Sequence, residues 1–162
     1  MLDIHPTFKK MNFKQEQQIL VLHAPKNFQE VLHAIQNHTT LYQEMQPSIQ
    51  WPFVLLFVKE KVKMEQQISL VFPQLEPDAK LWVAYPKKSS KNYQSDISRD
   101  DGWQIFGKLG LEPVRMVAID EDWSALRFRR VKFIKTITRS PKMALTDEAK
   151  KRSTKNKSNP ED

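Results

Sequence analysis

Short apolar runs recur along the chain, each separated from the next by a polar stretch. The runs at residues 18–23, 51–58 and 81–85 are apolar on both faces, as is typical of buried strands in a parallel sheet. A fourth strand is expected at residues 113–120. Residues 124–129 follow it with period-2 alternation, which predicts a half-exposed edge strand joined to the fourth by a short hairpin.

Helical spacing of apolar residues fills the intervals between these strands. Asn27 is a suitable N-cap for a first helix, with Glu30 at the capping-box position. A second helix is predicted over residues 60–75, where Pro73 is expected to break the last turn. The two helices lie between successive strands, which is the arrangement of right-handed crossovers in a parallel sheet.

A third helix is predicted before the last two strands. Ser98 is its expected N-cap, Asp101 occupies the capping-box position, and Gly110 is a suitable stop. Residues 41–50 are expected to hold at most a short irregular strand. We therefore predict a small three-layer, Rossmann-like α/β domain with a mostly parallel sheet that ends in an antiparallel hairpin.

Charge divides the chain into unequal parts. The net charge is +7, and residues 131–162 hold nine basic and four acidic residues against seventeen and fifteen in residues 1–130. The basic excess therefore belongs mainly to the C-terminal segment. We predict a loose lead-in at residues 1–14, the α/β domain at residues 15–130, and a basic, disordered tail at residues 131–162.

Composition excludes several classes of chemistry. The chain has no cysteine, which removes disulfides, thiolate nucleophiles and cysteine metal sites. His33 and His38 lack metal spacing with any carboxylate pair, so no metal is expected. No apolar run approaches the length of a membrane span, and no secretory signal is visible at the start of the sequence. We expect a cytoplasmic protein with no membrane partner.

The order of elements resembles the class I methyltransferase fold with parts missing. Residues 53–58 and 81–85 resemble its fourth and fifth strands, and residues 113–129 resemble its terminal antiparallel pair. Four motifs also resemble a bacterial family of short proteins, a domain of unknown function: LVLHAPKNF at 20–28, LWVAYPKKSSK at 81–91, SDISRDDGW at 95–103 and EPVRMVAIDEDWSALRFR at 112–129. The resemblance implies the fold and carries no activity with it.

The turn after the first strand departs from a cofactor-binding Rossmann domain. Such domains use a glycine-rich turn there, so that the backbone can approach the ligand. Here the turn is residues 23–26, and Pro25 removes one N–H donor from it. The three glycines of the chain, Gly102, Gly107 and Gly110, all lie far along the sequence. We therefore expect no cofactor in the familiar mode.

The carboxyl ends of the predicted parallel strands gather the candidate ligand-binding residues, because ligands of open α/β sheets bind at that edge. The sharpest candidate is a basic loop with the start of the next helix, a predicted anion site: Lys87, Lys88, Ser89, Ser90, Lys91 and Arg99. The alternative is a solvated, flexible surface loop.

A second candidate group follows the fourth strand. Trp123 is a candidate for lining a pocket there, Arg127 for reaching a carboxylate, and Asp120 or His23 for acid–base work. The alternatives are that Asp120 only bonds the turn and that Trp123 only covers the sheet edge. Asp96 with its neighbours is expected to cap the third helix or to form a small ion-pair cluster.

These observations favour a binding or regulatory module for a small anionic ligand over an enzyme. One alternative is a transferase-like enzyme that uses the same carboxyl edge. Another is a nucleic-acid accessory protein acting through the basic tail, although that tail carries little aromatic surface for stacking bases. The oligomeric state does not follow from the sequence.

Overall fold

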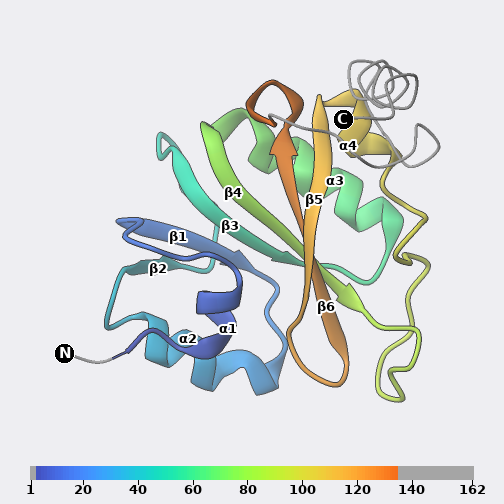
Figure 1. Cartoon of the computed structure of the whole chain (residues 1–162), viewed down its shortest axis with the longest axis horizontal. Coiled ribbons are helices and arrows are strands. Elements are labelled where there is room, and N and C mark those ends of the chain that lie inside the picture. The colour runs from blue at the N-terminus through green and yellow to red at the C-terminus, as the bar shows by residue number, and fades with distance from the viewer. Residues whose placement is uncertain (1–2, 135–162) are drawn as a thin grey trace, which may run out of the picture.

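The computed structural model describes residues 3–134, which form one six-stranded sheet (Figure 1). Its strands are β1 (Gln18–Leu22), β2 (Thr40–Tyr42), β3 (Trp51–Phe57), β4 (Leu75–Pro86), β5 (Leu111–Ala118) and β6 (Trp123–Arg130). They lie in the order β2-β1-β3-β4-β6-β5. The first four are mutually parallel, and β6 runs antiparallel to both β4 and β5. The predicted mostly parallel sheet with a terminal antiparallel hairpin is confirmed.

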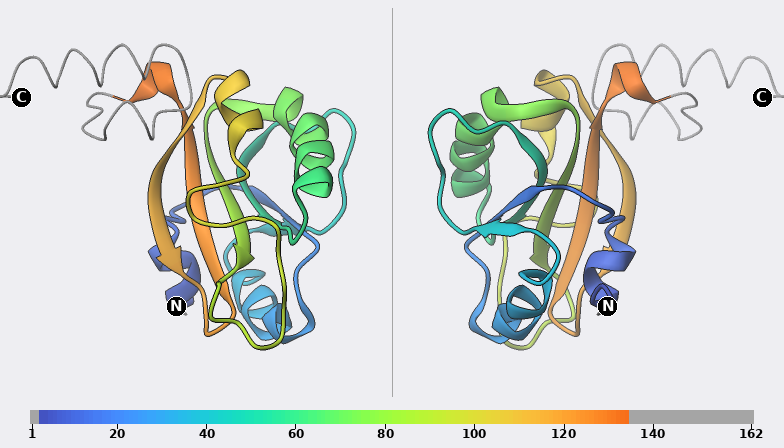
Figure 2. Two further views of the ribbon diagram at one scale, coloured as in Figure 1. Left: turned by 90° about the vertical axis from the view of Figure 1, so that its right-hand side faces the viewer. Right: turned by 90° about the vertical axis from the view of Figure 1, so that its left-hand side faces the viewer.

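Helices cover both faces of this sheet and make three layers. They are α1 (Pro6–Lys10), α2 (Gln29–Ile35), α3 (Lys61–Val71) and α4 (Gln104–Lys108). Three 3₁₀ turns, η1 (Lys26–Phe28), η2 (Phe72–Gln74) and η3 (Val131–Phe133), follow β1, α3 and β6. Figure 2 shows α1 and α3 on opposite sides of the sheet. Within residues 3–134, no helix is long and apolar enough to cross a membrane.

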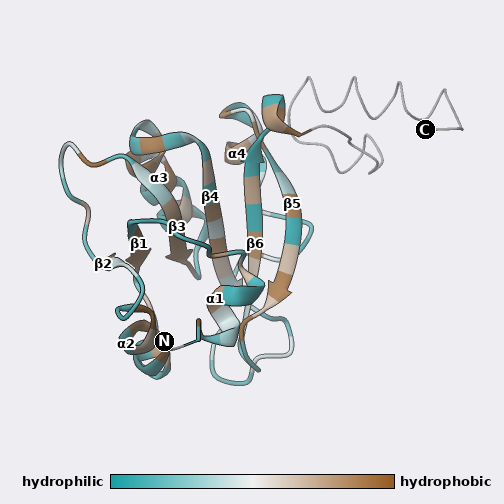
Figure 3. Cartoon of the chain, turned by 60° about the vertical axis from the view of Figure 1, so that its left-hand side comes forward, coloured by the Kyte–Doolittle hydropathy of each residue, from teal (hydrophilic) through white to brown (hydrophobic). Residues whose placement is uncertain are grey.

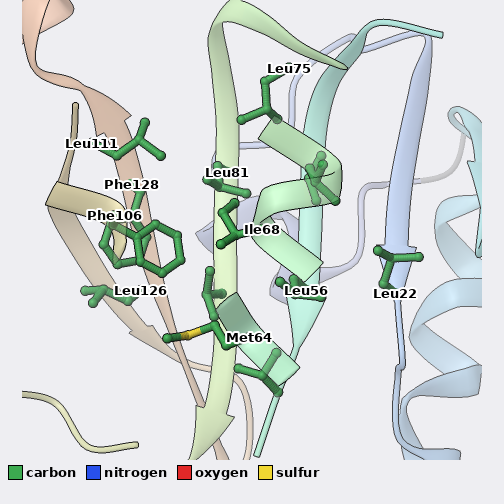
Figure 4. Packing of buried hydrophobic residues seen from close by; sticks show 14 of the residues in the cluster. Leu22, Leu56, Met64, Ile68, Leu75, Leu81, Phe106, Leu111, Leu126 and Phe128 are labelled. Atoms are coloured by element: carbon green, nitrogen blue, oxygen red, sulfur yellow. The ribbon is translucent and has the colours of Figure 1, made fainter. Parts of the chain in front are cut away.

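The strands are apolar because each face of the sheet has its own core. Along β3, Phe53, Leu55 and Phe57 pack into the cluster that contains α1 and α2. Val54 and Leu56 point the other way, into the cluster of α3 and α4 shown in Figure 4. The period of two in a strand thus sends alternate apolar residues to two cores. In Figure 3 the ends of β1 and β3 are brown, whereas β6 alternates between teal and brown.

The lead-in prediction for residues 1–14 is wrong for the part that the structure describes. This stretch contains α1, whose Phe8 is fully buried, as is the following Met11. The indole Nε1 of Trp82 in β4 donates a hydrogen bond of 3.0 Å to the carbonyl of Met11. A five-residue helix shows too little periodicity to be recognised in a sequence, so only its packing reveals it.

The strand at the sheet edge is also different from the one predicted. β6 lies between β4 and β5, so it is an interior strand, and β5 forms the edge. Apolar and polar residues alternate along β6 because one of its faces packs against a core, whereas part of its other face carries charged residues. The chain passes from β4 to the outer strand first and then returns between them, a topology that a hairpin motif alone does not specify.

Two predicted capping boxes do not form. Asn27 lies inside η1, and α2 begins at Gln29 without a side-chain cap. Ser98 and Asp101 exchange backbone hydrogen bonds of 3.1 and 3.3 Å in the loop, and the helix begins only after Trp103. The predicted helix stops are confirmed. Pro73 falls in η2 at the end of α3, and Gly110 follows α4 with φ +77°.

Candidate functional site

The carboxyl ends of β1 and β3 meet at the point where the chain connections diverge. α2 follows β1 on one face of the sheet, and α3 follows β3 on the other face. In open α/β sheets such a switch point opens a crevice that binds ligands. Here it holds a pocket of about 610 Å³, which we call the switch pocket. The polar, aromatic and turn residues that line it are His23, Pro25, Phe57, Lys59, Glu60, Lys63, Gln66, Gln67, Tyr93 and Trp123.

Aromatic rings form one side of the switch pocket. The ring of Trp123 lies with its centroid 5.1 Å from that of Phe57 and 5.0 Å from that of Tyr93. Phe57 and Trp123 are almost completely buried, so these rings are held in place by the core behind them. The buried indole Nε1 of Trp123 has no hydrogen-bond partner in the described structure. A pre-formed apolar surface therefore borders the pocket.

Charged side chains also line the switch pocket. The ammonium group of Lys59 lies 5.7 Å from the ring centroid of Tyr93, within cation–π range. Lys63 and Glu60 are exposed at the start of α3. No ion pair involves Lys59, Glu60 or Lys63 among residues 3–134. The pocket thus has two cations and one carboxylate available to a ligand.

His23 turns the chain out of β1 at the mouth of this pocket. Its φ is +60°, a left-handed conformation that usually belongs to glycine. The turn therefore has a glycine-like backbone path at one residue while it carries an exposed imidazole. Pro25 also lines the pocket and offers no N–H donor. The site consequently differs from a glycine-rich cofactor turn in both bulk and hydrogen bonding.

Part of the predicted anion site comes together in a second pocket at the same edge of the sheet. This pocket has a volume of about 310 Å³, and we call it the edge pocket. Lys87, Lys88 and Arg99 line it, together with Tyr85 and Ser124. Burial raises the pKa of the Tyr85 phenol, and the positive charge of Arg99 opposes that effect. Three predicted cations and the carboxylate of Asp100 therefore lie around one small cavity.

The serines of the predicted anion loop have a different placement. The hydroxyl of Ser90 donates to Oδ1 of Asp122 at 2.8 Å and accepts from the N–H of Tyr93 at 3.1 Å. Ser90 thus holds the loop together. Ser89 and Lys91 line neither pocket. The loop is anchored rather than merely solvated, because the N–H of Lys87 also donates to the Asp122 carbonyl at 2.7 Å.

Asp122 is the residue that the sequence reasoning missed. It lies in the β5–β6 turn and contacts the loop 86–95, which is distant in sequence. Asp120, the predicted acid–base candidate, accepts hydrogen bonds of 2.8 Å from the N–H groups of Asp122 and Trp123. Its role as a turn former, one of the two alternatives, is what the structure shows. The sequence DEDW contains the turn signal but nothing that identifies the distant partner.

The remaining candidates are positioned for other tasks. Oδ1 of Asp96 accepts the N–H of Lys61 at 2.7 Å and so caps α3, not the third predicted helix. The ammonium group of Lys61 pairs with Asp101 at 3.0 Å. Arg127 lines neither pocket and lies farther along β6. Among residues 3–134, no group of three His, Asp or Glu residues is arranged to hold a metal ion.

Comparison with known proteins adds information on the fold. No protein-family model matches the chain, and no curated protein matches it. The resemblance to the family of short bacterial proteins therefore stays a prediction.

Several solved structures share the overall fold of this chain. An O-methyltransferase family 2 protein from Planctomyces limnophilus in complex with apigenin superposes with a TM-score of 0.54 at 8% identity, over 78% of this chain and 56% of that one. Magnesium protoporphyrin IX methyltransferase from Synechocystis with bound SAM gives 0.51 at 12% identity, over 76% and 74%. At such identities the match concerns the fold alone. The chain has the Rossmann-like fold of methyltransferases, as its order of elements predicted.

Proposed function

We propose that the protein is a binding module for a small anionic ligand with a planar apolar part, held in the switch pocket. The observation that carries this proposal is the presence of two lysines without an ion pair beside aromatic rings at the switch point of the sheet. Lys59 and Lys63 supply the charge, and Phe57, Tyr93 and Trp123 supply the apolar surface. The volume of about 610 Å³ is of the size that small-molecule pockets have.

The chemistry of the walls supports an anion over a cation or a neutral ligand. Two ammonium groups outnumber the single carboxylate of Glu60, and none of the three forms an ion pair in the described structure. A phosphate, sulfonate or carboxylate would gain charge-assisted hydrogen bonds from the lysines. A flat ring would pack against Tyr93, which is half-buried and is supported from behind by the buried ring of Trp123.

The transferase alternative uses the same edge of the sheet. The methyltransferase-like fold is a coarse argument for it, and adenosylmethionine is the ligand it would require. His23 is then the available acid–base residue, since Asp120 is engaged in the turn. The turn of His23 and Pro25 argues against that cofactor, because it has no glycine and Pro25 removes one of its N–H donors. The nucleic-acid alternative rests on a tail that, from residue 135 on, lies outside the described residues.

The test is a calorimetric titration with phenyl phosphate, adenosine monophosphate and adenosylmethionine. We expect at least one of the two planar phosphates to bind, and the Lys59→Met, Lys63→Met double variant to bind it about ten-fold more weakly. The Lys9→Met, Lys108→Met variant is the charge-matched control, since both lysines are exposed and lie outside the switch pocket. Absence of binding by both phosphates, or equal loss in the control, would overturn the proposal.

A second pair of variants separates the two pockets. Lys87→Met with Lys88→Met removes charge from the edge pocket only. Loss of phosphate binding in this variant alone would place the anion at the loop predicted from the sequence, and not in the switch pocket. Binding of adenosylmethionine with methyl transfer to an acceptor would favour the transferase alternative.

A further inference from the structure

Two arginines face each other across strands on the sheet face that α1 partly covers. Arg127 of β6 is the cross-strand partner of Arg115 in β5 and of Trp82 in β4. Residues opposite one another in antiparallel strands project to the same face of a sheet, so the two guanidinium groups share one side. Trp123 and Ala125, earlier on the same face of β6, belong to the core, so Arg127 lies where the core ends.

The carboxylates near this pair are already engaged. Asp78 accepts two hydrogen bonds from Arg129, at 2.8 Å from both Nε and Nη2, a bidentate ion pair. Glu16 accepts from the ammonium group of Lys80 at 2.8 Å. Asp78 and Glu16 are therefore each matched with a cation other than Arg115 or Arg127.

Arg127 and Arg115 have no such partner. Arg127 is half-buried, and its buried Nε has no hydrogen-bond partner in the described structure. No ion pair engages either arginine among residues 3–134. Burial lowers the pKa of Arg127, the positive charges of Arg129 and Arg115 lower it further, and the negative charges of Asp78 and Glu16 oppose this shift only in part. Like charges placed opposite each other destabilise a sheet, and a desolvated charge without an ion-pair partner adds to that cost.

We propose that Arg115 and Arg127 form a binding site for a phosphate monoester or inorganic phosphate. One guanidinium group can bind both oxygens of a carboxylate through two parallel hydrogen bonds. A phosphate has enough oxygens to accept such hydrogen bonds from two guanidinium groups. A phosphodiester offers only two free oxygens and is held between two substituents. A terminal phosphoryl group is therefore the better match for a recessed guanidinium beside an exposed one. This site is independent of the switch pocket, which neither arginine lines.

The test compares unfolding midpoints in sodium phosphate and in sodium chloride of equal ionic strength, together with a calorimetric titration of inorganic phosphate. We expect phosphate to raise the midpoint of the wild-type protein above that in chloride. Arg127→Met should remove this increment and weaken phosphate binding about ten-fold or more. Arg115→Met changes an exposed residue and so tests the site without disturbing the core. It should have the same effect on phosphate binding.

Arg130→Met is the charge-matched control on the same strand. The Nε of Arg130 donates to the carbonyl of Pro77, and its guanidinium lies over the ring of Phe72. We expect this variant to keep the phosphate response. Equal midpoints of the wild-type protein in phosphate and chloride would overturn the proposal, as would equal losses in Arg130→Met and Arg127→Met. Tighter, Arg127-dependent binding of single-stranded DNA than of phosphate would overturn the choice of ligand. Retention of the response in the Lys59→Met, Lys63→Met variant would separate this site from the switch pocket.

Discussion

The Oδ1 atom of Asp122 lies 2.8 Å from the hydroxyl oxygen of Ser90, thirty-two residues away in the chain. Through this hydrogen bond the β5–β6 turn holds the loop whose beginning lines the edge pocket and whose end lines the switch pocket. Lys87 lies on the first side and Tyr93 on the second. The shape of both pockets therefore depends on one carboxylate that contacts neither ligand space directly.

Replacement of Asp122 by alanine should release the loop. Ser90 and Asn92 lose their shared acceptor, and we expect a loss of about 1–3 kcal/mol in the free energy of unfolding. Urea denaturation measures this loss, and Asp122→Asn should recover part of it because it keeps a carbonyl acceptor. Glu121→Ala, at an exposed neighbour, is the control. Similar destabilisation by both alanine variants would contradict the anchoring role.

Phe8 should be essential for stability although it lies near the start of the chain. Its ring is fully buried, with centroids 5.8 Å from Phe53 and 6.3 Å from Phe28. Phe8→Ala is expected to cost about 3–5 kcal/mol through lost burial and the cavity that remains. Lys9→Ala, exposed on the same helix, should cost less than about 0.5 kcal/mol. Urea midpoints that differ little between the two variants would show that α1 is dispensable.

Lowering the pH should reduce the free energy of unfolding, because two carboxylates that form ion pairs in the folded chain become protonated. Burial alone would raise the pKa of Glu16, but hydrogen bonds from Lys80 and the N–H of Lys14 outweigh it and lower that pKa. The hydrogen bonds from Arg129 lower the pKa of Asp78. Because both pKa values are lower in the folded chain, the stability they confer is present at neutral pH and is lost as the pH falls through them.

The measurement is the urea midpoint between pH 7 and pH 3. The Glu16→Gln, Asp78→Asn double variant should show a shallower decline than the wild-type protein. Glu65→Gln, an exposed carboxylate of α3, should leave the decline unchanged. A double variant with the full acid sensitivity of the wild type would disprove the assignment.

His23→Gly should be tolerated, unlike most changes to glycine. A left-handed non-glycine residue costs about 1–2 kcal/mol, and glycine costs about 0.5–1 kcal/mol in chain entropy. The two effects nearly cancel, so the free energy of unfolding should stay within about 1 kcal/mol of the wild type. Asn12→Gly, at another left-handed residue with φ +62°, is the matched control. A loss well beyond this range at His23 alone would mean that its side chain is needed for folding.

The sequence predicted the fold wherever the signal was local. Runs of β-branched and apolar residues located the parallel strands, Pro73 and Gly110 marked helix ends, and a Lys-rich loop indicated the edge pocket. The sequence did not show which distant segments contact each other. Nothing local shows that β6 returns between β4 and β5, that Asp96 caps α3, or that Asp122 anchors a loop. The sequence predicted that ligands bind at the carboxyl edge of the sheet. It did not predict the switch pocket itself, because the walls of that pocket come from four separate segments.

The burial of α1 has a consequence for how the chain folds. Two of its polar contacts are made to residues far along the sequence. The indole of Trp82 is 71 residues beyond Met11, and the carbonyl that accepts from Lys10 belongs to Ala118, 108 residues on. The rings of Phe28 and Phe53 reach Phe8 from shorter distances along the sequence. The docking of α1 thus closes loops of very different lengths, and the longest of them, to β4 and to the end of β5, are the contacts expected to form slowly during folding.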